Sequence, residues 1–274
     1  MTQTRDEWAA QARHGTITTG DHCRIAWRCD GREDAPVLIL SNSLGTTMDM
    51  WQPQAGPFAE HFRVIRYDTR GHGGSGSPDG AYSLDRLGCD VIELADALGI
   101  GTFSFCGLSL GGMTAQWLGW RAPDRLERIV IANSSPYMGP PLAWQQRIDT
   151  VRGQGMGAIA DAVIERWFTQ KFRACPDNIA DVRTALLATS ATGYAGCCAA
   201  IRDMDMRPVL GLVQVPALVI GGTHDPATPP DHCAQLASGI PDAQCAMFPA
   251  AHLSSFELPR EFNAAVLFHL LGAL

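Results

Sequence analysis

Short, continuously apolar runs alternate along the chain with longer stretches whose apolar residues recur at helical spacing. Such runs, bounded by glycine, proline or charged residues, are typical of strands buried on both faces of a parallel sheet. Residues 83–98 carry their leucines on one side behind a capping serine, which is typical of a helix that covers a sheet. The pattern predicts an α/β fold with a mostly parallel central sheet flanked by helices. The apolar runs lie at 36–41, 63–67, 102–106, 129–132, 217–220 and 243–248.

The N-terminal part of the chain follows a different pattern. Residues 14–30 alternate polar and apolar side chains around Gly20 and Asp21, which is a hairpin signature. Because alternation indicates one buried and one solvated face, we expect this hairpin to form an antiparallel edge of the sheet.

The strand pattern is interrupted between residues 134 and 207. An all-helical segment inside an alternating strand and helix pattern is typical of a cap over the carboxyl ends of the strands. We therefore predict a core in two parts, 1–134 and 208–274, with a helical cap at 135–207 that selects the substrate. The predicted cap helices lie at 142–151, 157–168, 179–187 and 194–204.

The run at 102–106 leads into Gly107-Leu-Ser109-Leu-Gly111, where a strand is expected to turn sharply into a helix. Glycines two before and two after the serine remove the Cβ atoms that would collide in such a turn. The serine is then held in a strained backbone conformation with its hydroxyl exposed. Ser109 is therefore the predicted nucleophile. The helix is predicted from large side chains that recur at helical spacing after the turn, Met113, Trp117 and Trp120.

Two backbone amides are candidates for an oxyanion hole. The amide of Leu110 lies at a predicted helix N-terminus, where N–H groups are free and the helix dipole favours negative charge. The amide of Leu44 lies in the loop of small residues after the strand at 36–41, which is the place for a second donor. The alternative is a plain connection in which Asn42 caps its own turn.

An acid and a base follow the nucleophile in the order Ser, Asp, His. Asp225 lies in a proline-rich loop directly after a predicted strand, and His252 lies in the loop after the last one. We predict that Asp225 orients His252, which acts as the general base. Asp225 could instead form an Asx turn or cap a helix. His72 precedes the nucleophile and is given a structural or rim role, and His224 is disfavoured because the base normally lies on a later loop.

Composition and charge exclude several classes of function. The chain has 274 residues, 46% apolar and 18% charged residues, and a net charge of −7, with no basic run that would bind nucleic acid. Charges occupy the N-terminus where a signal peptide would be apolar, and no apolar run reaches membrane-spanning length. We therefore expect a cytoplasmic protein without nucleic-acid or membrane partners, whose oligomeric state the sequence leaves open.

The cysteines do not have the spacing of a metal site. There are nine, and a zinc site would need paired cysteine or histidine ligands at regular intervals. We expect neither a metal nor an organic cofactor. Four cysteines lie in apolar segments and are interpreted as small buried hydrophobic residues: Cys89, Cys106, Cys197 and Cys198.

Several segments carry a family resemblance. In the core they are Leu40-Ser-Asn-Ser-Leu-Gly-Thr46, Arg66-Tyr-Asp-Thr-Arg-Gly-His-Gly73 and Phe105-Cys-Gly-Leu-Ser-Leu-Gly-Gly-Met113, and in the cap they are 155–163, 165–168 and 193–204. With these segments the chain resembles the α/β-hydrolases, and closely resembles the 3-oxoadipate enol-lactonases of bacterial aromatic-acid breakdown. The likeness covers nearly everything after residue 14. Residues 1–13 look like an extension, and residues 134–141, at the cap entrance, depart from the family pattern.

The resemblance implies a serine hydrolase that needs no cofactor. Ser109 would attack the lactone carbonyl while His252, oriented by Asp225, takes its proton, and the Leu44 and Leu110 amides would hold the oxyanion. The ring opens to an acyl-enzyme, and water activated by the histidine then releases 3-oxoadipate. The alternatives are a broader carboxylesterase or lactonase of the same fold and a non-catalytic ligand-binding protein of that fold.

An anionic lactone in a net acidic protein needs a local cation. Trp144 and Arg147 are three residues apart on a predicted cap helix and therefore share a face near the cap entrance. Arg147 could bind the substrate carboxylate through two hydrogen bonds while the Trp144 indole packs against the lactone ring. The alternative is a solvated arginine beside a tryptophan that anchors the cap.

Overall fold

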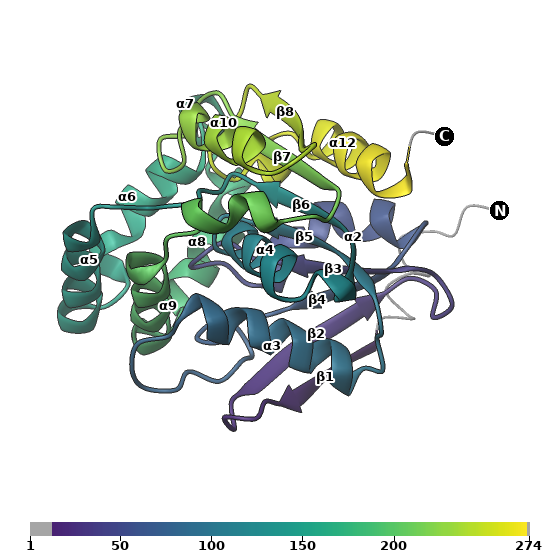
Figure 1. The fold of residues 1–274 in the computed structure, drawn as a ribbon. Coiled ribbons are helices and arrows are strands. Elements are labelled where there is room, and N and C mark those ends of the chain that lie inside the picture. The colour runs from purple at the N-terminus through teal and green to yellow at the C-terminus, as the bar shows by residue number, and fades with distance from the viewer. Residues whose placement is uncertain (1–12, 273–274) are drawn as a thin grey trace.

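The computed structural model describes residues 13–272, which contain an eight-stranded sheet in the order β1-β2-β4-β3-β5-β6-β7-β8 (Figure 1). The predicted extension at 1–13 falls outside these residues except for Arg13, where β1 begins. The strands are β1 (Arg13–Thr18), β2 (Arg24–Asp30), β3 (Val37–Ser41), β4 (Arg63–Tyr67), β5 (Phe103–Leu108), β6 (Leu126–Ala132), β7 (Ala217–Gly222) and β8 (Gln244–Phe248).

The sheet is mostly parallel, as predicted. β1 pairs antiparallel with β2, and β2 pairs antiparallel with β4, so the predicted hairpin and its edge position are confirmed. All other neighbouring strands are parallel. Their carboxyl ends therefore meet at one edge of the sheet, where the loops that follow β3, β5, β7 and β8 come together.

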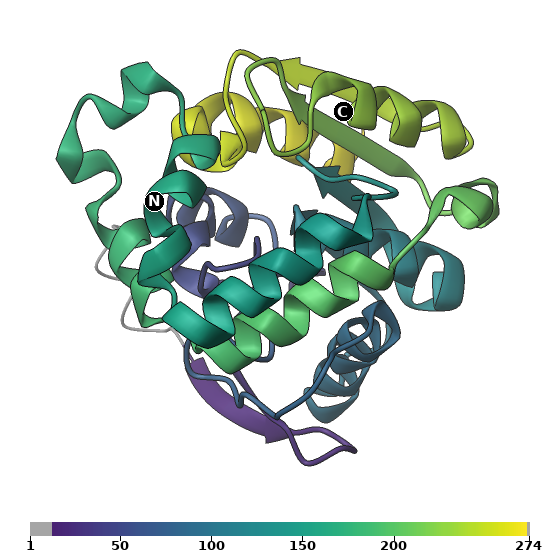
Figure 2. The ribbon, with the colours of Figure 1, turned by 90° about the vertical axis from the view of Figure 1, so that its left-hand side faces the viewer.

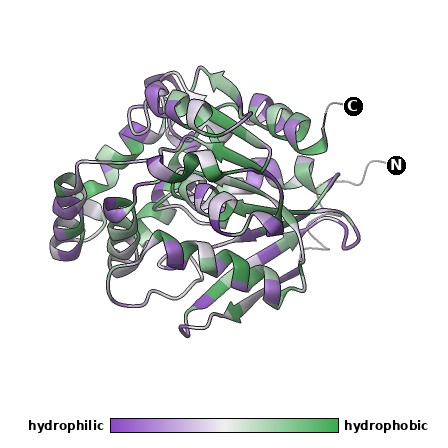
Figure 3. Cartoon of the chain, in the orientation of Figure 1, coloured by the Kyte–Doolittle hydropathy of each residue, from purple (hydrophilic) through white to green (hydrophobic). Residues whose placement is uncertain are grey.

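Helices cover both faces of the sheet, because each strand buries side chains on both sides. One face is covered by α3 (Leu84–Ala97), α4 (Leu110–Arg121) and α10 (Pro230–Gly239), and the other by α2 (Gln52–Ala59) and α12 (Pro259–Leu271) (Figure 1). The predicted cap of α3 is confirmed, since the Ser83 side chain accepts a hydrogen bond from the Arg86 amide. The central strands are mostly hydrophobic in Figure 3, as expected for a sheet that is covered on both faces.

Only helices lie between β6 and β7, at the carboxyl edge of the sheet. They are α5 (Pro141–Gln154), α6 (Gly157–Trp167), α7 (Gln170–Arg173), α8 (Ala180–Ala188) and α9 (Ala191–Asp203). α5 and α9 pack side by side across this edge (Figure 2). The four predicted cap helices are present, and the one-turn helix α7 is an addition to them.

The shorter elements complete the path of the chain. They are the 3-10 helices η1 (Met48–Trp51), η2 (Pro123–Arg125), η3 (Pro176–Asn178) and η4 (Arg207–Leu212), and the helical turn α11 (Ser254–Glu257). Within residues 13–272, no single helix is long and apolar enough to span a membrane, and α8 and α9 satisfy that criterion only as a pair bent by 93°.

β5 and β6, like β7, extend beyond the apolar runs that predict them. β6 begins at Leu126 rather than at 129, because Leu126 pairs with Phe103 although charged residues follow it. β5 extends to Leu108, because the ladder with β6 continues until the chain turns at Ser109. Strand pairing, which is a tertiary contact, therefore outweighs the local pattern at both ends.

Candidate active site

The turn between β5 and α4 has the backbone geometry that the sequence predicts, but the expected exposure of Ser109 was wrong. Ser109 is buried, because helices α5, α6 and α9 close over the cavity that it lines. Ser109 has φ 57° and ψ −110°, a strained conformation for a residue with a side chain, and α4 begins at the next residue. A Cβ atom on Gly107 would lie 2.0 Å from the Gly111 carbonyl oxygen, and one on Gly111 would lie 2.3 Å from the Ser41 carbonyl oxygen. Both glycines are therefore required by backbone contacts, and together they fix the position of Ser109.

The structure brings Asp225 and His252 together from the loops after β7 and β8. The Nδ1 atom of His252 lies 2.8 Å from Oδ2 of Asp225, and both side chains are buried. Burial by itself would raise the pKa of Asp225, but the adjacent His252 and several hydrogen bonds outweigh it and lower this pKa to about 2. The carboxylate is therefore ionised and accepts the Nδ1 proton, which leaves Nε2 of the imidazole available to accept a proton.

Two further residues hold the carboxylate. Thr228 donates its hydroxyl to Oδ2 of Asp225 at 2.7 Å and its amide to Oδ1 at 2.9 Å. Asn133, at the end of β6, donates its side-chain amide to Oδ2 at 3.0 Å and accepts a hydrogen bond from the Ser254 hydroxyl. Our sequence analysis missed Asn133 and Thr228. The position of Asn133 directly after a buried strand was the available signal, since strand ends carry the other site residues.

Ser109 and His252 line one cavity of about 140 Å³ at the carboxyl edge of the sheet, beneath the cap. Its walls combine core loops with the cap helices α5, α6 and α9. A cavity of this size admits a small ligand, because it is several times the volume of one water molecule but well below that of a drug-sized site. The larger apolar or aromatic lining residues are Leu44, Met113, Met138, Trp144, Val163, Trp167, Tyr194 and Ile201.

The two predicted oxyanion donors lie next to Ser109 and at the cavity wall. Leu110 is the first residue of α4, and Leu44 lines the cavity. Within residues 13–272, neither amide donates a hydrogen bond, whereas the neighbouring amide of Gly111 donates to the Asn42 carbonyl oxygen. Both amides are therefore free to bind an oxyanion, and their assignment as donors stays a prediction.

His72 holds the loop that carries Leu44. Its Nε2 atom accepts a hydrogen bond of 2.8 Å from the amide of Gly45, so the proton lies on Nδ1, 3.2 Å from the Arg70 carbonyl oxygen. Burial lowers the pKa of His72 to about 4, which keeps the ring neutral near pH 7 and able to accept. The structural role predicted for His72 is therefore confirmed.

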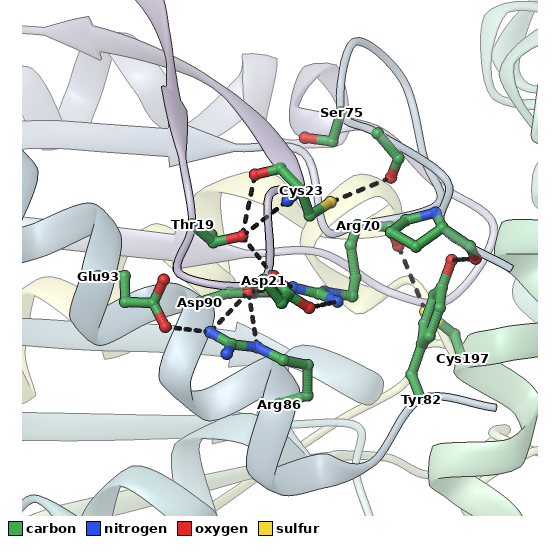
Figure 4. Close-up of polar contacts among 12 residues, drawn as sticks. Thr19, Asp21, Cys23, Arg70, Ser75, Tyr82, Arg86, Asp90, Glu93 and Cys197 are labelled. Carbon is green, nitrogen blue, oxygen red and sulfur yellow. Dashed lines mark hydrogen bonds and ion pairs between the residues drawn. The ribbon is translucent and has the colours of Figure 1, made fainter. Parts of the chain in front are cut away.

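Arg70 anchors the loop that contains His72 (Figure 4). Its guanidinium donates two hydrogen bonds of 2.6 Å to the Asp90 carboxylate on α3 and two more, of 2.7 and 3.0 Å, to Asp21 in the β1–β2 turn. Arg86 adds a second cation beside Asp90. A buried arginine with two carboxylate partners has its donors satisfied, so this network fixes the loop firmly in the fold.

Trp144 and Arg147 share a face of α5, as predicted, and both line the cavity with Ser109. The Arg147 guanidinium carbon lies 4.8 Å from the centre of the Trp144 ring, and the indole N–H donates to the Met138 carbonyl oxygen. The structure adds a second cation that our sequence analysis missed, Arg166 on α6. It lies one turn after Val163, another lining residue, and this helical spacing was the signal that could have found it.

The disfavoured candidates lie apart from this cavity. His224 is exposed although it adjoins Asp225, and it does not line the cavity. Within residues 13–272, no three His, Cys, Asp or Glu side chains gather to form a metal site. A reaction without metal or cofactor stays a prediction.

One interpretation of the cysteines was wrong. Cys106, Cys197 and Cys198 are buried, but Cys89 is only partly buried. It lies on α3 beside the apolar face and not within it, because helical spacing places residue 89 at the boundary between the buried and the solvated side.

Comparison with known proteins agrees with this geometry. The sequence profile of the alpha/beta hydrolase family matches residues 37–265. The chain belongs to the alpha/beta hydrolase family. Within this family, 3-oxoadipate enol-lactonase 2 of Acinetobacter baylyi is 43% identical over 252 residues, which cover 92% of this chain and 94% of that protein. The resemblance to the enol-lactonases, stated from sequence motifs, is therefore confirmed, as is the prediction of a hydrolase.

Solved alpha/beta hydrolases superpose closely on the chain. The enol-lactonase from Burkholderia xenovorans LB400 is 41% identical with a TM-score of 0.92, and 94% of this chain and all of that chain are covered. A hydrolase from Pseudomonas aeruginosa PA01 is 44% identical with a TM-score of 0.92, with 95% of this chain and 99% of that chain covered. The predicted α/β-hydrolase fold is thus confirmed.

Proposed function

We propose that this alpha/beta hydrolase opens the ring of 3-oxoadipate enol-lactone, or of a very similar small lactone, to the dicarboxylate. One observation carries the proposal: the strained Ser109, the His252–Asp225 pair and the cap cation Arg147 converge on a single small cavity. The 43% identity to a named 3-oxoadipate enol-lactonase supports this substrate. A five-membered ring with one carboxymethyl group suits a cavity of about 140 Å³ better than a long acyl chain does.

The first half of the reaction forms an acyl-enzyme. His252 takes the proton of Ser109 through Nε2 as the hydroxyl attacks the lactone carbonyl, and Asp225 stabilises the imidazolium that results. The amides of Leu44 and Leu110 donate to the oxyanion. Collapse of the tetrahedral intermediate breaks the ring C–O bond and leaves an enolate, which takes a proton from His252 and relaxes to the ketone.

The second half restores the enzyme. His252, neutral again, takes a proton from water as the water attacks the acyl carbon. When the second tetrahedral intermediate collapses, the Ser109 oxygen takes back a proton from His252. The acyl group leaves as a carboxylic acid, which loses its proton to the solvent and becomes a carboxylate. The product therefore carries one more negative charge than the substrate does.

Arg147 gives the site its preference for an anion in this proposal. The guanidinium would donate hydrogen bonds to the carboxymethyl carboxylate at the cap end of the cavity, with the Trp144 indole against the ring. Arg147→Ala should lower kcat/KM for the carboxylated lactone by roughly ten- to a hundredfold, as expected for a lost charge-assisted hydrogen bond. The loss for neutral p-nitrophenyl acetate should be far smaller. Equal losses for both substrates would assign Arg147 to the structure of the cap instead.

The second candidate is a broader carboxylesterase or lactonase. Met138 lines the cavity and belongs to residues 134–141, which depart from the family pattern, so the entrance can alter substrate choice. Turnover of the enol-lactone against a panel of simple esters and lactones decides between the two. A kcat/KM for the enol-lactone at least about a hundredfold above the panel supports our proposal, and comparable values across the panel favour the broader enzyme.

A labelling experiment separates both candidates from a non-catalytic ligand-binding protein. A fluorophosphonate probe should modify Ser109 in the wild type and fail to modify Ser109→Ala, because only an activated serine reacts. Absence of labelling in the folded wild type would contradict a serine hydrolase mechanism.

A further inference from the structure

Two guanidinium groups line the same small cavity beneath the cap, Arg147 from α5 and Arg166 from α6. Within residues 13–272, no carboxylate lies within ion-pair distance of either. The arginines buried in the core are different, since Arg66 pairs with Asp30 and Arg70 with Asp90. The cavity therefore contains two cations whose charge the described protein does not neutralise.

This arrangement is unfavourable in the absence of a ligand. Burial lowers the pKa of Arg166, and the nearby positive charge of Arg147 lowers it further. The nearest acid on the same helix, Glu165, is largely exposed and lies beside Arg173. A pair of like charges in a partly desolvated site is costly, so it points to an anionic ligand that completes the site.

We infer that Arg147 and Arg166 form one carboxylate-binding subsite and that Arg166 is a second specificity-determining residue. Its ligands are small molecules with a carboxylate at one end and an ester, lactone or acid group that reaches Ser109 at the other. The lactone substrate in this description rests on the proposed function, whereas the carboxylate subsite does not. The dicarboxylate product also fits, and we expect it to inhibit.

The surroundings of the two arginines leave few other places for a carboxylate. Val163 and Trp167 on α6 and Ile201 on α9 supply apolar walls, and the opposite part of the cavity is occupied by Ser109 and His252. A carboxylate has two oxygens, and each can accept hydrogen bonds from a separate guanidinium. In a cavity of about 140 Å³, a single carboxylate can therefore be shared by both.

The first test is binding of adipate, a dicarboxylate of the product's length without its keto group. Thermal unfolding is followed with and without adipate for the wild type, Arg166→Met and Arg147→Met. Arg152→Met serves as the matched control, because Arg152 lies on α5, is exposed and does not line the cavity. Adipate should raise the Tm of the wild type and of the control by several degrees, and should have little effect on the other two variants.

The Tm of the unliganded variants separates binding from structure. If Arg166 serves a ligand, its removal relieves repulsion with Arg147 and the Tm of Arg166→Met should equal or exceed that of the wild type. A merely structural arginine would instead lower the Tm when replaced. An adipate shift that persists in Arg166→Met would overturn the inference.

Kinetics provide the second test. Arg166→Met should lose about ten- to a hundredfold in kcat/KM for the carboxylated lactone, and this loss should exceed the loss on p-nitrophenyl acetate by at least about tenfold. The double variant Arg147→Met/Arg166→Met should lose less than the product of the single losses, because both residues bind the same group. Multiplicative losses would contradict a shared carboxylate.

The two proposals fail in different ways. Adipate binding that depends on Arg166, without turnover of the enol-lactone, would uphold the carboxylate subsite and reject the proposed substrate. Normal enol-lactone turnover by Arg166→Met would reject the subsite and leave the proposed function intact.

Discussion

Individual side chains in this hydrolase are fixed by unusually complete sets of hydrogen bonds. The carboxylate of Asp225 accepts from two backbone amides, from Thr228, from Asn133 and from His252. These hydrogen bonds stabilise the ionised carboxylate and fix its orientation. The His252 ring, which donates to this carboxylate, is therefore held in one tautomer and one position. The geometry is therefore ready before a substrate binds.

The proposed triad is tested by replacing its members one at a time. Ser109→Ala and His252→Ala should fold normally and lose hydrolysis by at least about a thousandfold, because the residues act as a unit. Asp225→Asn should be less damaging but still severe, since the amide disturbs the histidine tautomer. Turnover is measured with the enol-lactone, and circular dichroism verifies folding. Near-normal turnover by Ser109→Ala or His252→Ala would reject the mechanism, and by Asp225→Asn would reject only the assigned acid.

At the scale of elements, the loop after β8, which carries the proposed base His252, is hydrogen-bonded to the cap helices between β6 and β7. Glu257 on α11 accepts hydrogen bonds from the amide and the hydroxyl of Thr169, just after α6, and from the amide of Ala251, next to His252. The amide of Leu253 also donates to the Trp167 carbonyl oxygen. The cap therefore does more than cover the cavity, because its hydrogen bonds to this loop also help to fix the position of His252, the proposed base.

We expect Glu257→Gln to weaken the hydrogen bonds between the loop after β8 and the cap, since a side-chain amide has one acceptor oxygen in place of two. Because these hydrogen bonds position His252, kcat should fall several-fold for carboxylated and neutral substrates alike, with little change in KM. The Tm should fall by a few degrees for the loss of a charge-assisted hydrogen bond. Glu261→Gln, on an exposed position of α12, is the matched control. A loss confined to carboxylated substrates would instead make Glu257 part of anion recognition.

At the scale of the whole molecule, neutral buried histidines make stability depend on pH. Burial lowers the pKa of His72 to about 4 and also lowers the pKa of His269. A histidine with a lowered folded pKa binds fewer protons in the folded state than in the unfolded state. Its stabilising contribution is complete above the unfolded pKa of about 6.5 and is lost as the pH falls towards 4.

The free energy of unfolding should therefore decrease between pH 6.5 and pH 4, with His72 contributing up to about 3 kcal/mol of the change. Urea unfolding of the wild type at pH 7 and at pH 4.5 measures this decrease. His72→Gln, whose side-chain oxygen can still accept from Gly45, should lose less stability over the same interval. His14→Gln, on the exposed edge strand β1, is the control and should behave as the wild type does. An unchanged pH dependence in His72→Gln would reject the titration of this residue.

The linear pattern of residues was sufficient to predict most of the architecture and to nominate the three residues of the proposed triad. Buried runs identify strands because a doubly covered sheet tolerates few polar side chains, and Gly107 and Gly111 identify the turn because backbone atoms approach too closely for a Cβ. Ser109, Asp225 and His252 follow three of these strands, so parallel pairing alone brings their loops to one edge.

The tertiary structure decided which side chains come into contact although they are far apart in the sequence. Asn133 follows β6 and contacts Asp225 only once β6 has paired with β7. In the same way, packing brings His72, after β4, to the amide of Gly45, and Arg166 on α6 to the cavity that Arg147 lines. The periodicity of apolar residues describes one helix or strand at a time. It therefore shows which face of that element is buried, but not which other element packs against this face. The sequence by itself determined the strands, the turn at Ser109 and the residues proposed as catalytic. Packing determined their partners and the charge of the cavity, because those depend on distances between elements that no local pattern contains.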